Sequence, residues 1–428
     1  MCGFFFTNNK SKCSDWNFED ILQRGFSHEE FFHNDVYAIQ SVLPCVNETV
    51  DFSLFNTTDY IFLYTGEIYN YNRSKFKNDT EQVLYDILNK NSNIHYNGMY
   101  AYVFYDKKSK EVIYRRDKTG QVPLFIYEKN NHLIISTTIK SIVKTIKALP
   151  NKQSLELWKT SKHFIFNDTP WQDIYAVIPC SNELYYYNSN IKDIFKKLKP
   201  DYYTYLKSAS INSGGIDSGI VSKWFGEFSV AINHVTKDYI SNKLDFAFNV
   251  CEKEWVQYVD EFIEKTYLFP YTWSWVGYYI LGKKLKDKVN VLYTGEGADE
   301  IFGGYPDYEA GIRTPYSKPF PIDENNLLVS NKLLDQKYFI PISAMGANLA
   351  LGCFTIEPRS PFLDRRILNN KSFIYENNKK TLKIYYEELY GCLPPPKQGF
   401  AGFPDEYGRK KTWKDACFEK ILNIARLS

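Results

Sequence analysis

The sequence lacks the cysteine patterns of a disulfide-rich domain or a zinc site. Its eight cysteines are scattered, with no CxxC pair and no Cys/His cluster at metal-binding spacing, and its six histidines form no HExxH motif. Scattered cysteines are typical of reduced, intracellular chains, so we expect a cytoplasmic protein. A disulfide framework and zinc chemistry are therefore excluded as explanations of its function.

Long apolar runs and an excess of charge are also missing. No run approaches about 18 apolar residues, and no basic stretch followed by a long apolar segment opens the chain, so neither a membrane span nor a signal peptide is expected. The 52 Lys and Arg residues against 50 Asp and Glu leave a net charge of +2. This balance gives no global attraction to nucleic acid or to a membrane, so we expect neither as a partner.

The length and composition indicate two domains with real cores. A chain of 428 residues exceeds what one core usually organises, and 44% of its residues are hydrophobic. Aromatic residues make up 17%, and most are expected to be ordinary packing and surface rings. The pattern of elements changes at about Tyr205, so we place the first domain at 1–195 and the second at 196–428, with the polar stretch 188–203 as the junction.

Short β-type runs separated by turn signals dominate the first half. One helical pattern, at 79–88, interrupts them. The strands are too numerous for one sheet, so we predict an α+β domain of layered antiparallel sheets. The predicted strands are CGFFFT, DYIFLYTG, MYAYVFYD, EVIYRR, HLIISTT and ELYYYN.

The second half repeats a strand, a glycine-rich loop and a helix. SASIN precedes the loop SGGIDS, and VNVLY precedes TGEGADE. This repetition predicts an α/β fold with a doubly wound parallel sheet. Ligands of such sheets bind beyond the carboxyl ends of the strands, which is where both loops stand.

The loop INSGGIDS, at 211–218, has the composition of an anion site. Gly214 and Gly215 expose backbone N–H groups near a helix N-terminus, where phosphate oxygens are favoured. The spacing differs from GxxxxGK[ST], so a P-loop that cleaves a γ-phosphate is disfavoured. Asp217 would repel a phosphate unless magnesium bridged the two. A simple turn with a capping Ser or Asp is the alternative.

A second loop, TGEGADEIFGGY at 294–305, carries three carboxylates among four glycines. Glu296, Asp299 and Glu300 would repel one another unless a cation or an amine were present. A solvated acidic loop is the alternative. Two further segments, TIEPRSPFLD at 355–364 and PPPKQGFAGF at 394–403, place charges among prolines and glycines and are weak signals individually.

The chain opens MCGFFF, which places a thiol directly behind the initiator methionine. If the methionine is removed, Cys2 carries both a nucleophilic sulfur and an α-amine of pKa about 8 that can serve as its base. A structural or chance cysteine is the alternative.

Taken together, these segments resemble a known family. SGGIDS, TGEGADEIFGGY, RSPFLD and PKQGF, in this order behind MCG, resemble the glutamine-dependent asparagine synthetases of the class II glutamine amidotransferase/asparagine synthase family, from Cys2 to about Phe403. The resemblance implies an N-terminal nucleophile (Ntn) glutaminase domain followed by an ATP pyrophosphatase (PP-loop) domain. It implies that ATP and Mg²⁺ convert aspartate to β-aspartyl-AMP, which ammonia from glutamine then attacks. Aspartate, glutamine and ATP are the implied partners, with a homodimer as the candidate assembly.

The resemblance also assigns residues in the second half. Asp217 and Asp299 are the implied magnesium ligands, and Glu296 and Lys397 are the implied catalytic residues. Arg359 and Asp364 are expected to organise the site. The implied ATP-binding residues are Ile211, Ser213, Gly214, Gly215, Asp217, Ser218, Ile232, Thr294 and Gly295.

In the first half the resemblance makes Cys2 the nucleophile that attacks the glutamine amide. Thr65 and Gly66 stand where the family stabilises the reacting oxygen. Asp79 matches the acid that receives the α-ammonium of glutamine. The implied glutamine-binding residues are Thr65, Gly66, Glu67 and Asp79.

Two departures weaken the expected glutamine pocket. The family usually reads NGEIYN, whereas this chain reads TGEIYN, with Thr65 in place of an oxyanion-donating asparagine. The chain also has no Arg or Lys from 25 through 72, so Gln40 or Ser41 stands where an arginine is expected to clamp the glutamine carboxylate. Three explanations stay open: a slow glutaminase, a site for another amide or for free ammonia, or a structural cap.

Two rival functions also stay open. The chain could be an amidotransferase of this family acting on another carboxylate, because the acceptor contacts lie in loops between the motifs. It could instead be a non-catalytic descendant of a synthetase. The presence of Ser213, Asp217, Glu296 and Lys397 argues against the second rival.

Overall fold

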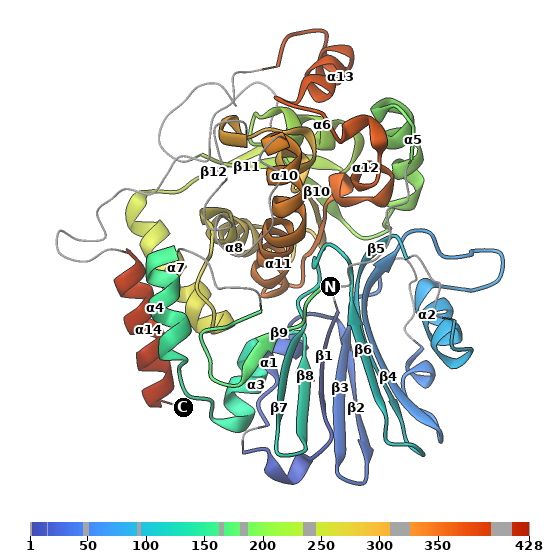
Figure 1. Ribbon diagram of the computed structural model, residues 1–428, viewed down its shortest axis with the longest axis vertical. Helices are drawn as coiled ribbons and strands as arrows, with labels where there is room; N and C mark the ends of the chain where they lie inside the picture. The colour runs from blue at the N-terminus through green and yellow to red at the C-terminus, as the bar shows by residue number, and fades with distance from the viewer. Residues whose placement is uncertain are drawn as a thin grey trace.

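The computed structural model describes residues 2–14, 16–45, 51–91, 96–161, 167–179, 187–233, 245–308, 326–394 and 413–427. Lys397 and most of the predicted strand ELYYYN lie outside the described residues. In Figure 1 the strands of the first half, blue to teal, form the lower part of the molecule, and most of the second half lies above them. Within the described residues, no helix has the length and apolar character needed to cross a bilayer.

Two antiparallel sheets build the first half. The larger sheet has the order β2–β3–β1–β8–β7–β9, and its strands span Ser27–His33, Val36–Val42, Gly3–Thr7, His132–Ser136, Phe125–Lys129 and Ile174–Ala176. The smaller sheet has the order β4–β5–β6, with strands Tyr60–Ile68, Gly98–Asp106 and Val112–Arg116. In β1, Phe4 and Phe6 face the smaller sheet, whereas Phe5 faces the opposite side. The predicted α+β class of layered antiparallel sheets is confirmed.

The predicted helix at 79–88 is confirmed as α2, Asp79–Leu88. It begins with a reciprocal cap, in which the Asn78 side chain accepts from Glu81 N–H at 2.9 Å and the Glu81 carboxylate accepts from Lys77 N–H at 2.8 Å. This cap fixes the chain just before the helix. The other helices of the first half are α1 at Glu19–Leu22, α3 at Ile139–Ile146 and α4 at Lys152–Ser161.

A five-stranded parallel sheet forms the centre of the second half. Its order is β12–β11–β10–β13–β14, and its strands span Phe246–Asn249, Phe228–Asn233, Ser208–Ile211, Val291–Tyr293 and Glu357–Arg359. Helices cover both faces, so the predicted doubly wound α/β fold is confirmed. On one face lie α5, Ile191–Asp201, α6, Ile216–Trp224, and α13, Lys380–Tyr390. On the other face lie α7, Glu252–Thr266, α8, Trp273–Leu285, and α11, Ile340–Gly352.

The predicted junction, 188–203, contains helix α5. Its apolar side chains, Ile191, Ile194, Phe195 and Leu198, are buried in a cluster with residues of the parallel sheet. The remaining helices of the second half are α9 at Ala298–Phe302, α10 at Leu327–Leu334, α12 at Arg365–Leu368 and α14 at Trp413–Leu427.

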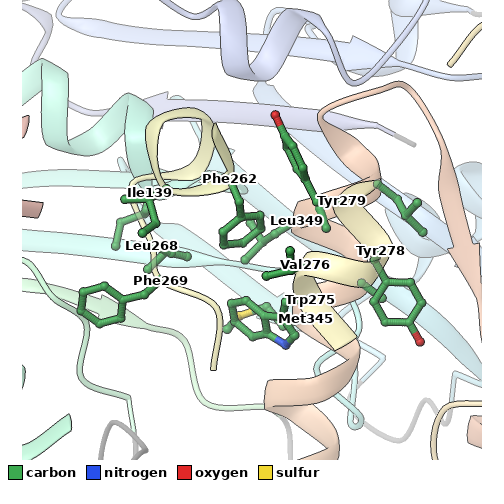
Figure 2. Packing of buried hydrophobic residues seen from close by; sticks show 14 of the residues in the cluster. Ile139, Phe262, Leu268, Phe269, Trp275, Val276, Tyr278, Tyr279, Met345 and Leu349 are labelled. Carbon is green, nitrogen blue, oxygen red and sulfur yellow. The ribbon is translucent and has the colours of Figure 1, made fainter. Parts of the chain in front are cut away.

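One hydrophobic cluster joins the two halves. It contains Ile139 of α3 from the first half and Phe262, Trp275 and Leu349 of α7, α8 and α11 from the second half. Figure 2 shows these side chains gathered in one layer. Because buried apolar area is the main source of folding free energy, this shared core holds the two halves together.

Candidate active site

The loops singled out in the sequence meet at the switch point of the parallel sheet. From β10 the chain order runs to β11 and β12 on one side and to β13 and β14 on the other. Beyond their carboxyl ends, the Thr294 and Ser360 hydroxyls lie 2.8 Å apart, and Thr294 N–H donates to the carbonyl of Arg359 at 2.9 Å. The loops after β13 and β14 are thereby joined at the edge where ligands of such sheets bind.

The SGGIDS loop folds as a tight turn between β10 and α6. Ser213 N–H donates to the hydroxyl oxygen of Ser218 at 3.1 Å, and the two serine hydroxyls lie 3.0 Å apart. Gly214 has a φ of +81°, in the left-handed region that favours glycine. A Cβ on Gly295 would lie 3.1 Å from the Cβ of Asp217, so this loop and the loop after β13 approach closely.

Asp217 and Asp299 share one cation, the ammonium of Lys379. The Lys379 Nζ bonds Asp217 and lies 2.8 Å from an oxygen of Asp299. Burial alone would lower the pKa of Lys379, but the two carboxylates outweigh it and raise the pKa above its ordinary value. The two predicted magnesium ligands therefore lie against the same ammonium group, and their carboxylate oxygens are ligands that suit Mg²⁺.

Glu296 lies beside this pair with both carboxylate oxygens occupied. The Tyr278 hydroxyl donates to one oxygen at 2.5 Å, and the Ser343 hydroxyl donates to the other. Burial raises the pKa of Glu296, although both hydroxyl bonds oppose the shift. A carboxylate whose pKa is raised binds a proton more readily than one at its ordinary pKa, which suits a group that accepts protons.

Glu300 is the third carboxylate of this loop, and it is 4% exposed. The Tyr305 hydroxyl donates to it at 2.7 Å. Burial and the neighbouring charge of Asp299 raise its pKa to about 8. The expected repulsion within the acidic loop is thus relieved in two ways, by Lys379 at Asp299 and by the tendency of Glu300 to stay protonated.

In the first half, Cys2, Gly66, Glu67 and Asp79 line one pocket of about 410 Å³. The Cys2 sulfur accepts from Leu43 N–H at 3.3 Å. Burial raises the pKa of its thiol to about 11, so the sulfur would need a base to react at neutral pH.

The two predicted acids of this pocket, Glu67 and Asp79, are held in place by different groups. Asp79 accepts from the Tyr64 hydroxyl at 2.5 Å and from Ile68 N–H at 2.8 Å. Glu67 lies 3.4 Å from a guanidinium nitrogen of Arg359. Burial raises the pKa of both carboxyl groups, against the hydrogen bonds at Asp79 and against the Arg359 charge at Glu67.

Thr65 and Gln40, the two positions that depart from the family pattern, are both turned inward. The Thr65 hydroxyl donates to the backbone carbonyl of Cys2 at 3.0 Å, which fixes the backbone of Cys2. Gln40 is fully buried in β3, where its amide donates to Gly3 and Ser41 carbonyls and accepts from Tyr64 N–H. Thr65, Gln40 and Ser41 are not among the described residues that line the pocket.

Gly66 is required by the local packing. Its φ is +120°, and a Cβ would lie 1.9 Å from the carbonyl oxygen of Met99 on the paired strand β5. No larger residue fits there without moving one of the strands. This glycine therefore fixes the course of the chain between Thr65 and Glu67, at the wall of the pocket.

Arg359 and Asp364 connect the two halves. Arg359 is fully buried and bonds Glu357 at 2.9 Å and the carbonyls of Tyr202 and Tyr203, in addition to its contact with Glu67. Asp364 accepts from the side-chain amide of Asn97 at 2.8 Å. Both residues thus tie segments of the first half to segments of the second, and their predicted role in organising the site stays a prediction.

The remaining predicted residues have simple positions. Ile211 ends β10 and Ile232 lies in β11, whereas Lys397 lies outside the described residues. A larger cavity, of about 900 Å³, lies between the halves, and none of the predicted site residues is among its described lining. The sequence did not predict a role for Tyr278, Ser343 or Lys379, because no local motif marks them.

Comparisons with known proteins agree with the motifs. Residues 53–195 match a family described as "Glutamine amidotransferase domain", and residues 209–340 match one described as "Asparagine synthase". Together the two segments cover more than half of the chain.

Individual relatives carry the same pair of activities in their names. Glutamine-hydrolysing asparagine synthetase 1 of Bacillus subtilis is 23% identical over 91% of this chain and 71% of its own length. Asparagine synthetase B of Escherichia coli is 24% identical over 64% of this chain. A Methanocaldococcus jannaschii protein named for the same activity is 27% identical over 61% of this chain. The matches span 62% of the M. jannaschii protein and 53% of the E. coli protein.

Proposed function

Because the chain belongs to the asparagine synthase family and carries its glutamine amidotransferase domain, we propose that it amidates aspartate to asparagine at the expense of ATP. The proposed route is adenylation of the β-carboxylate followed by attack of ammonia, which comes from glutamine hydrolysed at Cys2 or from solution. The observation that carries the proposal is the convergence of Asp217, Asp299 and Glu296 at the switch point of the sheet.

The adenylation site would be formed by the turn after β10. A carboxylate is unreactive toward ammonia until one of its oxygens belongs to a leaving group, and AMP supplies that group. Ser213, Gly214 and Ser218 would contact the pyrophosphate, with Asp217 and Asp299 as ligands of Mg²⁺. When bound, magnesium would neutralise the charge that builds on the phosphates. Lys379 already supplies one positive charge between the two acids.

Glu296 would move the proton in the amidation step. Attack by ammonia leaves a proton on the new nitrogen, and a carboxylate whose pKa is raised by burial accepts it more readily than an exposed one. Tyr278 and Ser343 hold both oxygens of Glu296 and so orient the group. Lys397 would stabilise the charge on the adenylate during the attack.

Cys2 would attack the side-chain amide of glutamine. The buried thiol, with its pKa of about 11, needs a base, and the α-amine of Cys2 itself becomes one once Met1 is removed. Thr65 holds the Cys2 carbonyl, Gly66 shapes the wall, and Asp79 and Glu67 would receive the α-ammonium of glutamine. A thioester would form as ammonia leaves, and water would then release glutamate.

The first experiment is to measure asparagine formation from aspartate, ATP and magnesium, with either glutamine or ammonium chloride as the nitrogen source. Formation with both supports the complete proposal. Formation with ammonium alone supports the synthetase and rejects the glutaminase.

The acceptor is tested separately, by pyrophosphate release with a panel of carboxylic acids. Release that requires aspartate supports asparagine as the product. Release with another acid and none with aspartate would assign the chain to a different amidotransferase reaction in the same family.

A further inference from the structure

The Cys2 pocket is rich in acids. Glu67 and Asp79 line it from the inside, and Asp51 and Glu81 also belong to its lining. Free glutamine is a zwitterion, so acids can hold its ammonium but repel its carboxylate. An amino-acid amide therefore needs a cation at this pocket as well.

The cations nearest along the chain are engaged elsewhere. Arg24 is buried, donates to the carbonyl of Cys2 at 3.1 Å and reaches Asn348 of α11. Arg73 lies over the Tyr71 ring and 3.8 Å from Asp201. Lys75 lies 3.8 Å from the centre of the Tyr85 ring. None of these three is among the described residues that line the pocket.

Lys77 is the one Lys or Arg among the described residues that line the pocket. It is exposed, and its backbone is fixed because its N–H donates to Glu81 at 2.8 Å, immediately before the cap of α2. Asp79, two residues further on, also lines the pocket. A cation and an acid two residues apart in the chain thus both border the pocket, and glutamine carries a carboxylate and an ammonium on one α-carbon.

We infer that Lys77 pairs with the α-carboxylate of the amide substrate in the Cys2 pocket. Strand β3 contains no Lys or Arg that could pair with this carboxylate. This inference rests on the proposed use of glutamine. Hydrogen bonds from Ser53 are the main reason that the pKa of the Asp51 carboxyl group is lowered, and the Lys77 charge adds a smaller effect in the same direction. Asp51 is therefore a weak competitor of the substrate carboxylate for the Lys77 ammonium.

The identity of the cation has a measurable consequence. A lysine is a flexible point charge, whereas an arginine offers a planar pair of donors to a carboxylate. An exposed lysine is also screened by salt. Glutamine should therefore bind weakly, its affinity should fall as ionic strength rises, and Lys77→Arg should bind glutamine at least as tightly as Lys77 does.

The test measures equilibrium binding by calorimetry in the Cys2→Ala protein, which cannot hydrolyse the ligand. Lys77→Ala should weaken glutamine binding about tenfold, since the variant loses a charge-assisted hydrogen bond whose strength solvent screening reduces. Lys75→Ala, a matched lysine two residues away, should change the affinity less than about twofold. Glutamine α-amide, which lacks the carboxylate charge, should bind the Lys77→Ala protein and its parent equally.

The outcomes separate this inference from the proposed function. Equal glutamine affinity of the Lys77→Ala protein and its parent overturns the role of Lys77, as does an equal loss of affinity for the α-amide. Absence of any glutamine binding overturns it too. In that case, ammonium-dependent asparagine formation would still test the proposed synthetase reaction independently. Binding that depends on Lys77, without hydrolysis by the unmodified protein, keeps the inference and rejects the glutaminase.

Discussion

The two pockets of this molecule use their polar residues in different ways. In the second half, Asp217 and Asp299 face each other and share the ammonium of Lys379. In the first half, Thr65 and Gln40 make their hydrogen bonds to the backbone of the fold. A motif that is complete in sequence corresponds here to a site whose acids meet around a shared cation. A motif with departures corresponds to a pocket whose altered residues have become part of the scaffold.

This contrast also suggests how the two halves tolerate change. The scaffold around Cys2 depends on backbone carbonyls and close strand packing, so its substitutions should affect stability as well as chemistry. Glu296 in the second half is held by side chains of α8 and α11, and Asp217 and Asp299 are held by Lys379, just before α13. Their substitutions should affect chemistry first.

The largest effect is expected at the site that contains Asp217 and Asp299. Asp217→Asn removes one of the two carboxylates that face the shared cation, so adenylation should fall about 1,000-fold or more, because a catalytic metal supplies several kcal/mol. The measurement is aspartate-dependent pyrophosphate release. Glutamine hydrolysis by the same variant is the control and should stay near the unmodified rate. Retained pyrophosphate release would remove Asp217 from the proposed metal site.

The next effect tests whether the halves are chemically separate. Cys2→Ala should reduce glutamine-dependent asparagine formation to background. Cys45 is the one other thiol among the described residues that line the Cys2 pocket, and it is buried. Ammonium-dependent formation should remain within about twofold of the unmodified rate. Loss of both activities together would show that the two sites are not chemically separate.

A smaller, structural effect is expected at the wall of the Cys2 pocket. Gly66→Ala places a Cβ 1.9 Å from the Met99 carbonyl at a φ of +120°, and should lower the free energy of unfolding by about 3 kcal/mol or more. Gly391→Ala is the matched control, since Gly391 also has a positive φ but a Cβ at this position would meet nothing within 4 Å. It should cost about 1–2 kcal/mol. Equal losses in chemical denaturation would contradict the packing argument.

The smallest effect concerns pH. The folded state raises the pKa of Glu300 from 4.5 to about 8, so its stabilising contribution is present below pH 4.5 and is lost as the pH rises through 8. Glu300→Gln keeps the shape without the charge. Its melting temperature relative to the unmodified protein should therefore be higher at pH 9 than at pH 6. If the difference in melting temperature between the two proteins is the same at both pH values, folding does not raise the pKa of Glu300.

Sequence patterns predicted the elements with strong local signals. Helix α2 was located to the residue because a capping sequence precedes an amphipathic stretch, and the loops after β10 and β13 were located because parallel strands direct their ends to one edge. Strands β2, β3, β7 and β9 of the larger sheet were missed. β2 is an edge strand whose side chains are mostly exposed, so SHEEFFH has no periodic signal. β3 is buried along almost its whole length, so VYAIQSV has no alternation of apolar and polar residues.

Tertiary partners could not be predicted in the same way. Lys379 reaches Asp217 across 162 positions of the chain, and Tyr278 and Ser343 come to Glu296 from two different helices. Such contacts depend on how helices pack on the sheet, which a local pattern does not encode. The hydrogen bonds of the buried Gln40 side chain could not be predicted for the same reason. Its partners, Gly3 and Tyr64, lie on strands that become its neighbours only in the folded protein.

The contacts of Arg359 bear on how such a gene can change over time. This arginine takes its partners from both halves: Glu67 on one side, Glu357 and the carbonyl of Tyr202 on the other. A lineage supplied with free ammonia could lose Cys2 with little effect on folding. It could not easily delete the whole first half, since the deletion would uncover a buried guanidinium and one side of a shared core. The first half would then be inherited as a structural necessity, whatever becomes of its chemistry.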